Sequence, residues 1–177
     1  TAEYLARPEF QIWRGLSDRE KRSRITICVI DDNEFEPKQN LEHLGYRIEF
    51  LGNPNSINAV RGSQIVLCDL QGVGRAIDPV KQGAFFIKEI RSNFPDKYVI
   101  AYTGGGLHQS VTREALIAAD AFIKKDAITE DWKDKLDPFV QALLDPAMVW
   151  QRAREALIQR RVDTLSILQL EDAFVKS

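Results

Sequence analysis

Residues 25–32 read ITICVIDD, a short apolar run that ends directly in two carboxylates. The run is too short for a helix and is rich in β-branched side chains, which favours a β-strand. Its almost continuous apolarity predicts burial on both faces, as in a parallel sheet. Further runs of this kind lie at residues 47–51, 65–68, 98–102 and 121–123.

Helical patterns separate these runs. They cover residues 37–44, 56–61, 82–94, 111–118 and 131–144, the last of which contains a potential break at Pro138. Strands that alternate with helices predict a doubly wound α/β domain with a five-stranded parallel sheet and right-handed crossovers. In such a domain the functional site lies at the carboxyl ends of the strands.

The chain divides into three parts. Residues 25–144 form the predicted α/β domain, and residues 1–24 precede it as an arm whose large apolar side chains, such as Trp13, should pack on the domain. Residues 145–177 form a helical extension that begins at Asp145-Pro146 and has a break near Asp163. Apolar residues recur in the extension at three-four spacing, so we expect it to pack on the domain or on a second copy in a homodimer.

Composition excludes several classes of protein. The net charge of −2 gives no sign of a nucleic-acid partner. No apolar run approaches the roughly 20 residues that cross a membrane. Cys28 and Cys68 lie in predicted strands, so we expect two free buried thiols in a reducing cytoplasm. The extension carries a stripe of arginines that we interpret as a solvated helix face: Arg152, Arg154, Arg160 and Arg161.

Polar residues stand at the ends of four predicted strands. They are Asp31 and Asp32 after the first strand, Asp69 after the third, Thr103 with Gly104 after the fourth, and Lys125 after the fifth. None fits the hydrophobic pattern of its strand. In a parallel sheet they converge on one edge, where crowded carboxylates repel and a divalent cation relieves the repulsion.

This set of residues suits phosphoryl transfer. A carboxylate can act as the nucleophile and form an aspartyl-phosphate. Mg²⁺ takes one or two carboxylates and accepts phosphate oxygens. The charge of the transferring group must be met by cations and hydrogen-bond donors, which Lys125, the hydroxyl of Thr103 and the backbone N–H of Gly104 can supply.

The motifs "CVIDDNE", "IVLCDLQ", "IAYTGG" and "AADAFIKKD" resemble those of the response-regulator receiver domains, over roughly residues 25–144. The resemblance implies a flavodoxin-like strand order of 2-1-3-4-5. It implies a signalling domain in place of a classical enzyme, with self-catalysed phosphorylation and dephosphorylation. The implied partners are a histidine kinase or phosphotransfer protein and an output protein.

The resemblance also assigns roles to individual residues. Asp69 becomes the phosphoacceptor, and Thr103, Gly104 and Lys125 hold the phosphoryl group. The implied ligands of Mg²⁺ are Asp31 (through water), Asp32, Asp69 and the carbonyl of Gln71. Thr103 and the aromatic Phe122 form the implied switch. The segment after Asp69 is longer than is common in the family and lacks its usual Met-Pro-like step.

Other interpretations stay open. The run "IVLCDLQGVG" also looks like the first motif of haloacid-dehalogenase phosphatases, with Asp69 as nucleophile, but Gln71 stands where that family has its general acid. A receiver that no longer accepts phosphate and acts as a docking module is the third possibility. Taken singly, Asp31 and Asp32 could be helix caps and Lys125 a solvated side chain.

Overall fold

The computed structural model describes residue 5 and residues 7–104 and 109–176. Its sheet contains five parallel strands in the order β2-β1-β3-β4-β5. They are β1 (Thr26–Ile30), β2 (Arg47–Gly52), β3 (Ile65–Asp69), β4 (Tyr98–Thr103) and β5 (Ala121–Lys124). The predicted fold class and strand order are therefore confirmed.

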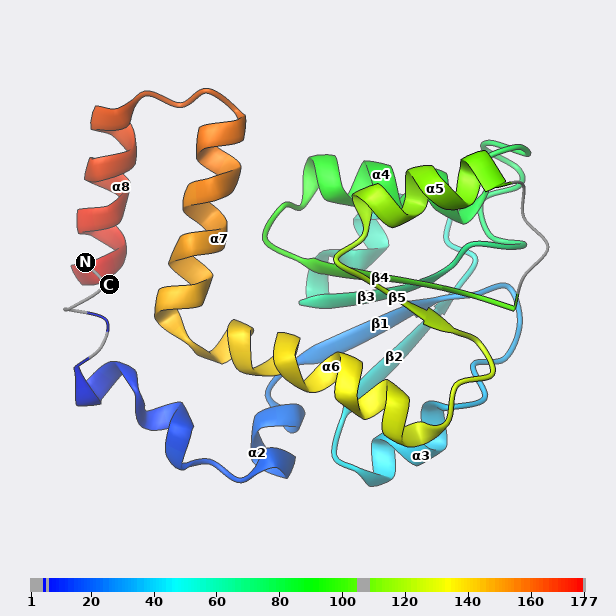
Figure 1. Ribbon diagram of the computed structural model, residues 1–177, viewed down its shortest axis with the longest axis horizontal. Helices are drawn as coiled ribbons and strands as arrows, with labels where there is room; N and C mark the ends of the chain where they lie inside the picture. The colour runs from blue at the N-terminus through cyan, green and yellow to red at the C-terminus, as the bar shows by residue number, and fades with distance from the viewer. Residues whose placement is uncertain (1–4, 6, 105–108, 177) are drawn as a thin grey trace.

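Helices cover both faces of the sheet (Figure 1). One face carries α3 (Lys38–His43) and α6 (Thr129–Leu144), and the other carries α4 (Gly83–Asn93) and α5 (Gln109–Ala118). The helix predicted at residues 56–61 is instead a 3-10 helix, η3 (Ile57–Gly62). It is a short segment in which only Val60 is buried, so packing does not impose a longer α-helix.

Pro138 lies inside α6 and does not break it. An interior proline removes one backbone hydrogen bond. The helix nevertheless continues because Trp132, Leu136 and Val140 are buried along the side of α6 that faces the sheet. Burial of these three side chains outweighs the local cost of the proline.

Strand residues alternate between two apolar clusters. In β1, Ile27 and Val29 pack toward α3 and α6, whereas Cys28 and Ile30 pack toward α4 and α5. The other central strands follow the same alternation. This two-sided burial explains why the strands read as continuous apolar runs. Both cysteines are free and buried, as predicted.

The arm and the extension meet in a third cluster. The extension consists of α7 (Pro146–Gln159) and α8 (Thr164–Lys176), which run side by side next to the α/β unit (Figure 1). Leu5 from the arm is buried with Trp150 and Ile167 of these helices. The break near Asp163 is present, and the Asp163 carboxylate accepts a hydrogen bond from the Ser166 N–H at 3.0 Å.

The rest of the arm contains η1 (Pro8–Phe10), η2 (Ile12–Gly15) and α2 (Asp18–Ser23). Arg22 of α2 forms a two-pronged ion pair with Asp137 of α6, at 2.9 and 2.7 Å. The Tyr46 hydroxyl donates to the same carboxylate at 2.6 Å. The arm is thus attached to both the extension and the α/β unit.

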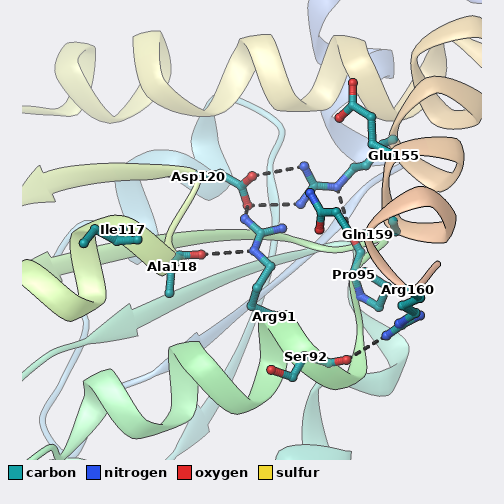
Figure 2. A pocket seen from close by; sticks show the side chains of 11 residues that line it. Arg91, Ser92, Pro95, Ile117, Ala118, Asp120, Glu155, Gln159 and Arg160 are labelled. Carbon is teal, nitrogen blue, oxygen red and sulfur yellow. Dashed lines mark hydrogen bonds and ion pairs between the residues drawn. The ribbon is translucent and has the colours of Figure 1, made fainter.

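Three arginines of the predicted stripe, Arg154, Arg160 and Arg161, are exposed as expected, but the interpretation as a solvated face is wrong for Arg152. Arg152 is partly buried and donates to both oxygens of Asp120 and to the carbonyls of Pro95 and Lys97. Its guanidinium also lies over the Tyr98 ring, 3.9 Å from the centroid. Figure 2 shows a second attachment, in which Arg160 donates to the Ser92 carbonyl at 2.7 Å. The error arose because Asp120 is far from Arg152 in sequence.

The outer surface of the extension is partly apolar. Leu165 and Leu168 of α8 are 66% and 56% exposed. Within the described part of the chain, no helix is long and apolar enough to cross a membrane.

Candidate functional site

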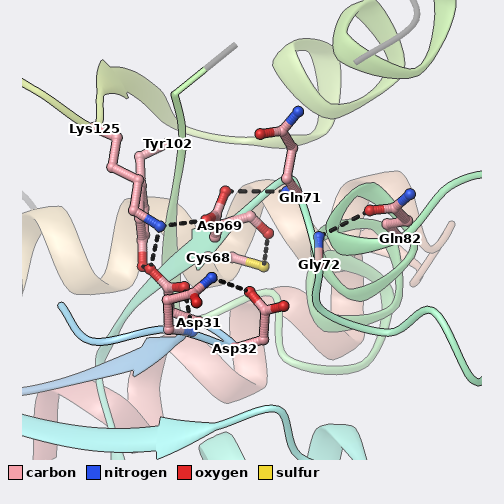
Figure 3. A network of polar contacts seen from close by, with 10 residues as sticks. Asp31, Asp32, Cys68, Asp69, Gln71, Gly72, Gln82, Tyr102 and Lys125 are labelled. Carbon is pink, nitrogen blue, oxygen red and sulfur yellow. Dashed lines mark hydrogen bonds and ion pairs between the residues drawn. The ribbon is translucent and has the colours of Figure 1, made fainter. Parts of the chain in front are cut away.

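The carboxyl ends of the strands bring the predicted charged residues together. Asp31 and Asp32 follow β1, Asp69 ends β3 and Lys125 follows β5. Because all strands are parallel, these residues share one edge of the sheet. Figure 3 shows Lys125 pointing at Asp31 and Asp69, with Asp32 beside them.

The three carboxylates form a cluster that can hold a metal ion. Asp31, Asp32 and Asp69 each offer an oxygen, and these oxygens lie within 4.8 Å of one another. Asp31 is 0% exposed and Asp69 3% exposed, whereas Asp32 is open to solvent. Oxygen ligands of this kind suit Mg²⁺, which also keeps several waters on its open side. The donor set therefore fits the predicted cofactor.

The Asp69 carboxylate is buried and is held by two hydrogen-bond donors. Burial raises the pKa of Asp69 above its ordinary value, although hydrogen bonds from the Gln71 N–H and from Lys125 act in the opposite direction. The Gln71 N–H lies 3.0 Å from Asp69 Oδ1 and Lys125 Nζ lies 2.7 Å from Oδ2. The two donors fix the orientation of the carboxylate.

Lys125 bridges two acids. Its Nζ lies 2.9 Å from Asp31 Oδ2 and 2.7 Å from Asp69 Oδ2. Burial alone would lower the pKa of Lys125, but hydrogen bonds to Asp69 and Asp31 outweigh burial and raise it. The ammonium therefore stays charged between the two carboxylates.

Of the remaining predicted residues, Thr103 and Gly104 lie at the end of β4, and Phe122 lies within β5. Thr103 is buried at the end of β4, and Gly104 next to it is exposed with open space around its Cα. Phe122 is partly buried against the cluster that faces α4 and α5. Gly105 and Gly106 of the same loop lie outside the described residues.

The long segment after Asp69 folds back over the site. Gly72 has a positive φ of +84° and packs on the Asp32 carboxylate. The Gly72 N–H donates to Gln82 Oε1 at 2.8 Å, which ties the two ends of the segment together. Gly83 packs on the Asp69 backbone so closely that a Cβ would lie 1.9 Å from the Asp69 carbonyl. Glycine is therefore required at both positions.

Tyr102 is a member of the site that the sequence analysis missed. Its hydroxyl donates to Asp31 Oδ2 at 2.8 Å, inside the fold. Burial and the facing Asp31 carboxylate raise the pKa of Tyr102, so it remains a neutral phenol. The available signal was a buried strand tyrosine directly before Thr103, because a buried phenol needs a polar partner.

Comparisons with known proteins agree on the fold. A receiver domain described as CheY-like, from Methanospirillum hungatei, is 20% identical with a TM-score of 0.54 and covers 67% of this chain and 95% of its own. The BeF3-activated receiver domain of DrrB, a Thermotoga maritima protein, is 21% identical with a TM-score of 0.52 and covers 66% and 97%. Chemotaxis protein CheY4 of Vibrio cholerae is 16% identical with a TM-score of 0.51 and covers 65% and 98%.

Neither a scan of protein-family models nor a search of curated proteins gave a match. At this level of identity the structural similarity shows the fold alone. The chain has the fold of response-regulator receiver domains, with the extension beyond it.

Proposed function

We propose that the chain is a receiver domain of a two-component signalling system that accepts a phosphoryl group on Asp69. The observation that carries this proposal is the position of Lys125, whose ammonium bridges Asp69 and Asp31 next to the exposed Asp32. One nucleophilic carboxylate, two further acids and one cation are the parts that phosphoryl transfer needs. The shared receiver fold supports the same conclusion.

The transfer step follows from these parts. An Asp69 oxygen forms a bond to phosphorus while the bond from phosphorus to a histidine nitrogen of a kinase or phosphotransfer protein breaks. The electron pair stays on the imidazole, which takes up a proton. Lys125 neutralises the negative charge that the phosphoryl oxygens bring, and Thr103 with the Gly104 N–H donates to them.

Mg²⁺ would be held by Asp32 and Asp69 directly, by Asp31 through water and by the Gln71 carbonyl. When bound, it offsets the repulsion between the carboxylates and the incoming phosphate. The Asp31 side chain is already engaged by protein donors, which suits a role behind a water molecule.

The alternative of a haloacid-dehalogenase-like phosphatase receives less support. That chemistry needs an acid two residues after the nucleophile to protonate the leaving group, and Gln71 cannot donate a proton in this way. A phosphorylation-incompetent docking module is disfavoured by the charged cluster, because burying two unused acids would destabilise the fold.

Incubation with acetyl phosphate and Mg²⁺, followed by intact-protein mass spectrometry, separates the three functions. A receiver gains the mass of one phosphoryl group and loses it slowly, with acetate as the other product. A phosphatase releases phosphate repeatedly from several phosphomonoesters and accumulates no label. A docking module shows neither reaction, and that result would overturn the proposal.

We propose that phosphorylation changes the contacts of the chain with other proteins. We also propose that the protein is cytoplasmic. The two free thiols support a reducing compartment. A second copy of the chain is one proposed partner, because Leu165 and Leu168 leave an apolar stripe on α8. Sedimentation should show a dimer that becomes a monomer when both leucines are replaced by serine, and an unchanged subunit number would remove the homodimer from the proposal.

A further inference from the structure

A buried tyrosine is built into the acidic cluster. Tyr102 is 0% exposed, and its ring lies 5.7 Å from the Phe35 ring and 5.6 Å from the Trp132 ring, measured between centroids. These contacts hold the ring in place and direct its hydroxyl to Asp31 Oδ2, 2.8 Å away. A hydroxyl held in this way acts as a fixed donor.

Asp31 depends on such a donor. It is fully buried, so each of its oxygens needs a hydrogen-bond partner. Oδ1 accepts from the Asn33 N–H at 2.9 Å, and Oδ2 accepts from both Tyr102 and Lys125. Lys125 is shared, because the same ammonium also donates to Asp69 at 2.7 Å. Of the two donors to Asp31 Oδ2, Lys125 therefore also donates to Asp69, whereas Tyr102 donates to Asp31.

Resting on the function proposed above, we propose that Tyr102 is a positioning residue that keeps Asp31 paired while Lys125 turns to the phosphoryl group on Asp69. Phosphorylation adds about two negative charges and new acceptor oxygens next to the ammonium. Lys125 can move toward these oxygens at little cost only if Asp31 Oδ2, which is buried, keeps another hydrogen-bond donor. The phenol then supplies the donor to Oδ2, and the Asn33 N–H still donates to Oδ1, so Asp31 keeps its orientation through the reaction.

The substitution Tyr102→Phe removes the hydroxyl and keeps the ring. Lys125 then becomes the donor on which Asp31 Oδ2 depends, and its movement toward the phosphoryl group carries a penalty. We expect phosphorylation by acetyl phosphate to slow by roughly ten- to a hundredfold, the factor that corresponds to losing a hydrogen bond to a charged group. Mg²⁺ affinity, measured by calorimetry without a phosphodonor, should change by less than about threefold, because Lys125 still covers Asp31 in that state.

Tyr46→Phe is a matched control. The Tyr46 hydroxyl donates to Asp137 Oδ1 at 2.6 Å, and the same oxygen accepts from Arg22 at 2.9 Å. The arrangement repeats that of Tyr102, Asp31 and Lys125 at a carboxylate outside the cluster. We expect a comparable loss of thermal stability with an unchanged phosphorylation rate. Equal slowing in both variants would reduce Tyr102 to a structural role and overturn the proposal.

A measurement on the parent protein tests the proposal without any substitution. The Tyr102 hydroxyl proton, recognised in NMR spectra by its contacts to the ring protons of Tyr102, should persist when beryllofluoride and Mg²⁺ mimic the phosphoryl group. Its loss in that state would show that the phenol leaves Asp31, which contradicts the proposal.

The outcomes separate this inference from the function on which it rests. If the parent takes up no phosphate, the proposed function and the role of Tyr102 fail together. If the parent is labelled on Asp69 and Tyr102→Phe is labelled at the same rate, only the role of Tyr102 fails. Labelling of the parent with slow labelling of Tyr102→Phe supports both.

Discussion

Gly72 packs directly on the carboxylate of Asp32: a Cβ on Gly72 would lie 2.2 Å from both Asp32 oxygens. Non-bonded atoms do not approach one another so closely, so a side chain at position 72 must displace the Asp32 carboxylate or the loop. The positive φ of +84° adds backbone strain for any residue other than glycine. The loop after Asp69 is therefore in direct contact with the carboxylate cluster of the proposed metal site and does not merely connect β3 to α4.

Gly72→Ala should displace Asp32 from the cluster and so weaken Mg²⁺ binding by roughly tenfold or more. That factor corresponds to a loss of about 1.4 kcal/mol or more in binding free energy. Titration calorimetry measures the affinity. Gly45→Ala is the control, since Gly45 also has a positive φ, of +99°, and packs on Arg19. That control should lose stability and keep its Mg²⁺ affinity. Equal Mg²⁺ affinities for the parent and Gly72→Ala would show that the contact between Gly72 and Asp32 does not affect metal binding.

Asp32→Ala separates metal binding from folding. Removing one of three crowded carboxylates relieves like-charge repulsion, so the metal-free variant should melt roughly 2–5 °C higher than the parent. Its Mg²⁺ affinity should fall, and the stabilisation by added Mg²⁺ should shrink with it. Thermal denaturation with and without Mg²⁺ checks both effects, with Glu36→Ala as a nearby acidic control outside the cluster. A metal affinity that survives Asp32→Ala would remove Asp32 from the ligand set.

Thr103→Ala tests the proposed switch. Thr103 and Phe122 lie on neighbouring strands, and movement of the Thr103 hydroxyl toward the phosphoryl group should allow Phe122 to shift. The variant should still accept phosphate, though more slowly. Amide chemical shifts in α5 and around Phe122 should respond to beryllofluoride much less than in the parent. If the shift changes match those of the parent, the protein signals by another route.

Arg152→Ala should weaken the attachment of the extension to the α/β unit. The guanidinium donates to Asp120 and to two backbone carbonyls, and its loss should cost on the order of 1.5–3 kcal/mol of unfolding free energy. Arg154→Ala, an exposed position on the same helix, should cost less than about 0.5 kcal/mol. Denaturant unfolding gives the energies, and limited proteolysis should cleave α7 earlier in Arg152→Ala. Equal stability and equal cleavage in the two variants would show that Arg152 does not anchor the extension.

The sheet and the charged residues at its edge could be predicted because each depends on local pattern. The apolar run before Asp31 predicts a central parallel strand, because such a strand is buried on both faces. Asp69 and Lys125 end similar apolar runs. Parallel strands then bring these ends together whatever the details of the loops. Lys125 could be placed at the site before its contacts with Asp31 and Asp69 were known.

Contacts between distant segments could not be predicted in this way. Tyr102 fits its strand as an apolar residue, and only the fold shows that its hydroxyl reaches Asp31. The position of Arg152 on α7 looks solvated until α7 is placed beside Asp120. The contact of Gly72 with Asp32 depends on the path of a long loop that has no periodic pattern. Each of these features joins elements whose relative placement a single sequence does not specify.

The central claim is that Asp69 carries the phosphoryl group, and reductive trapping tests it most directly. The protein is incubated with acetyl phosphate and Mg²⁺ and then treated with borohydride, which reduces an acyl phosphate to an alcohol and releases phosphate. Peptide mapping by mass spectrometry should find Asp69 converted to homoserine, with Asp31 and Asp32 unchanged and with no conversion in Asp69→Asn. Conversion at a different acid, or full labelling of a folded Asp69→Asn variant, would contradict the account.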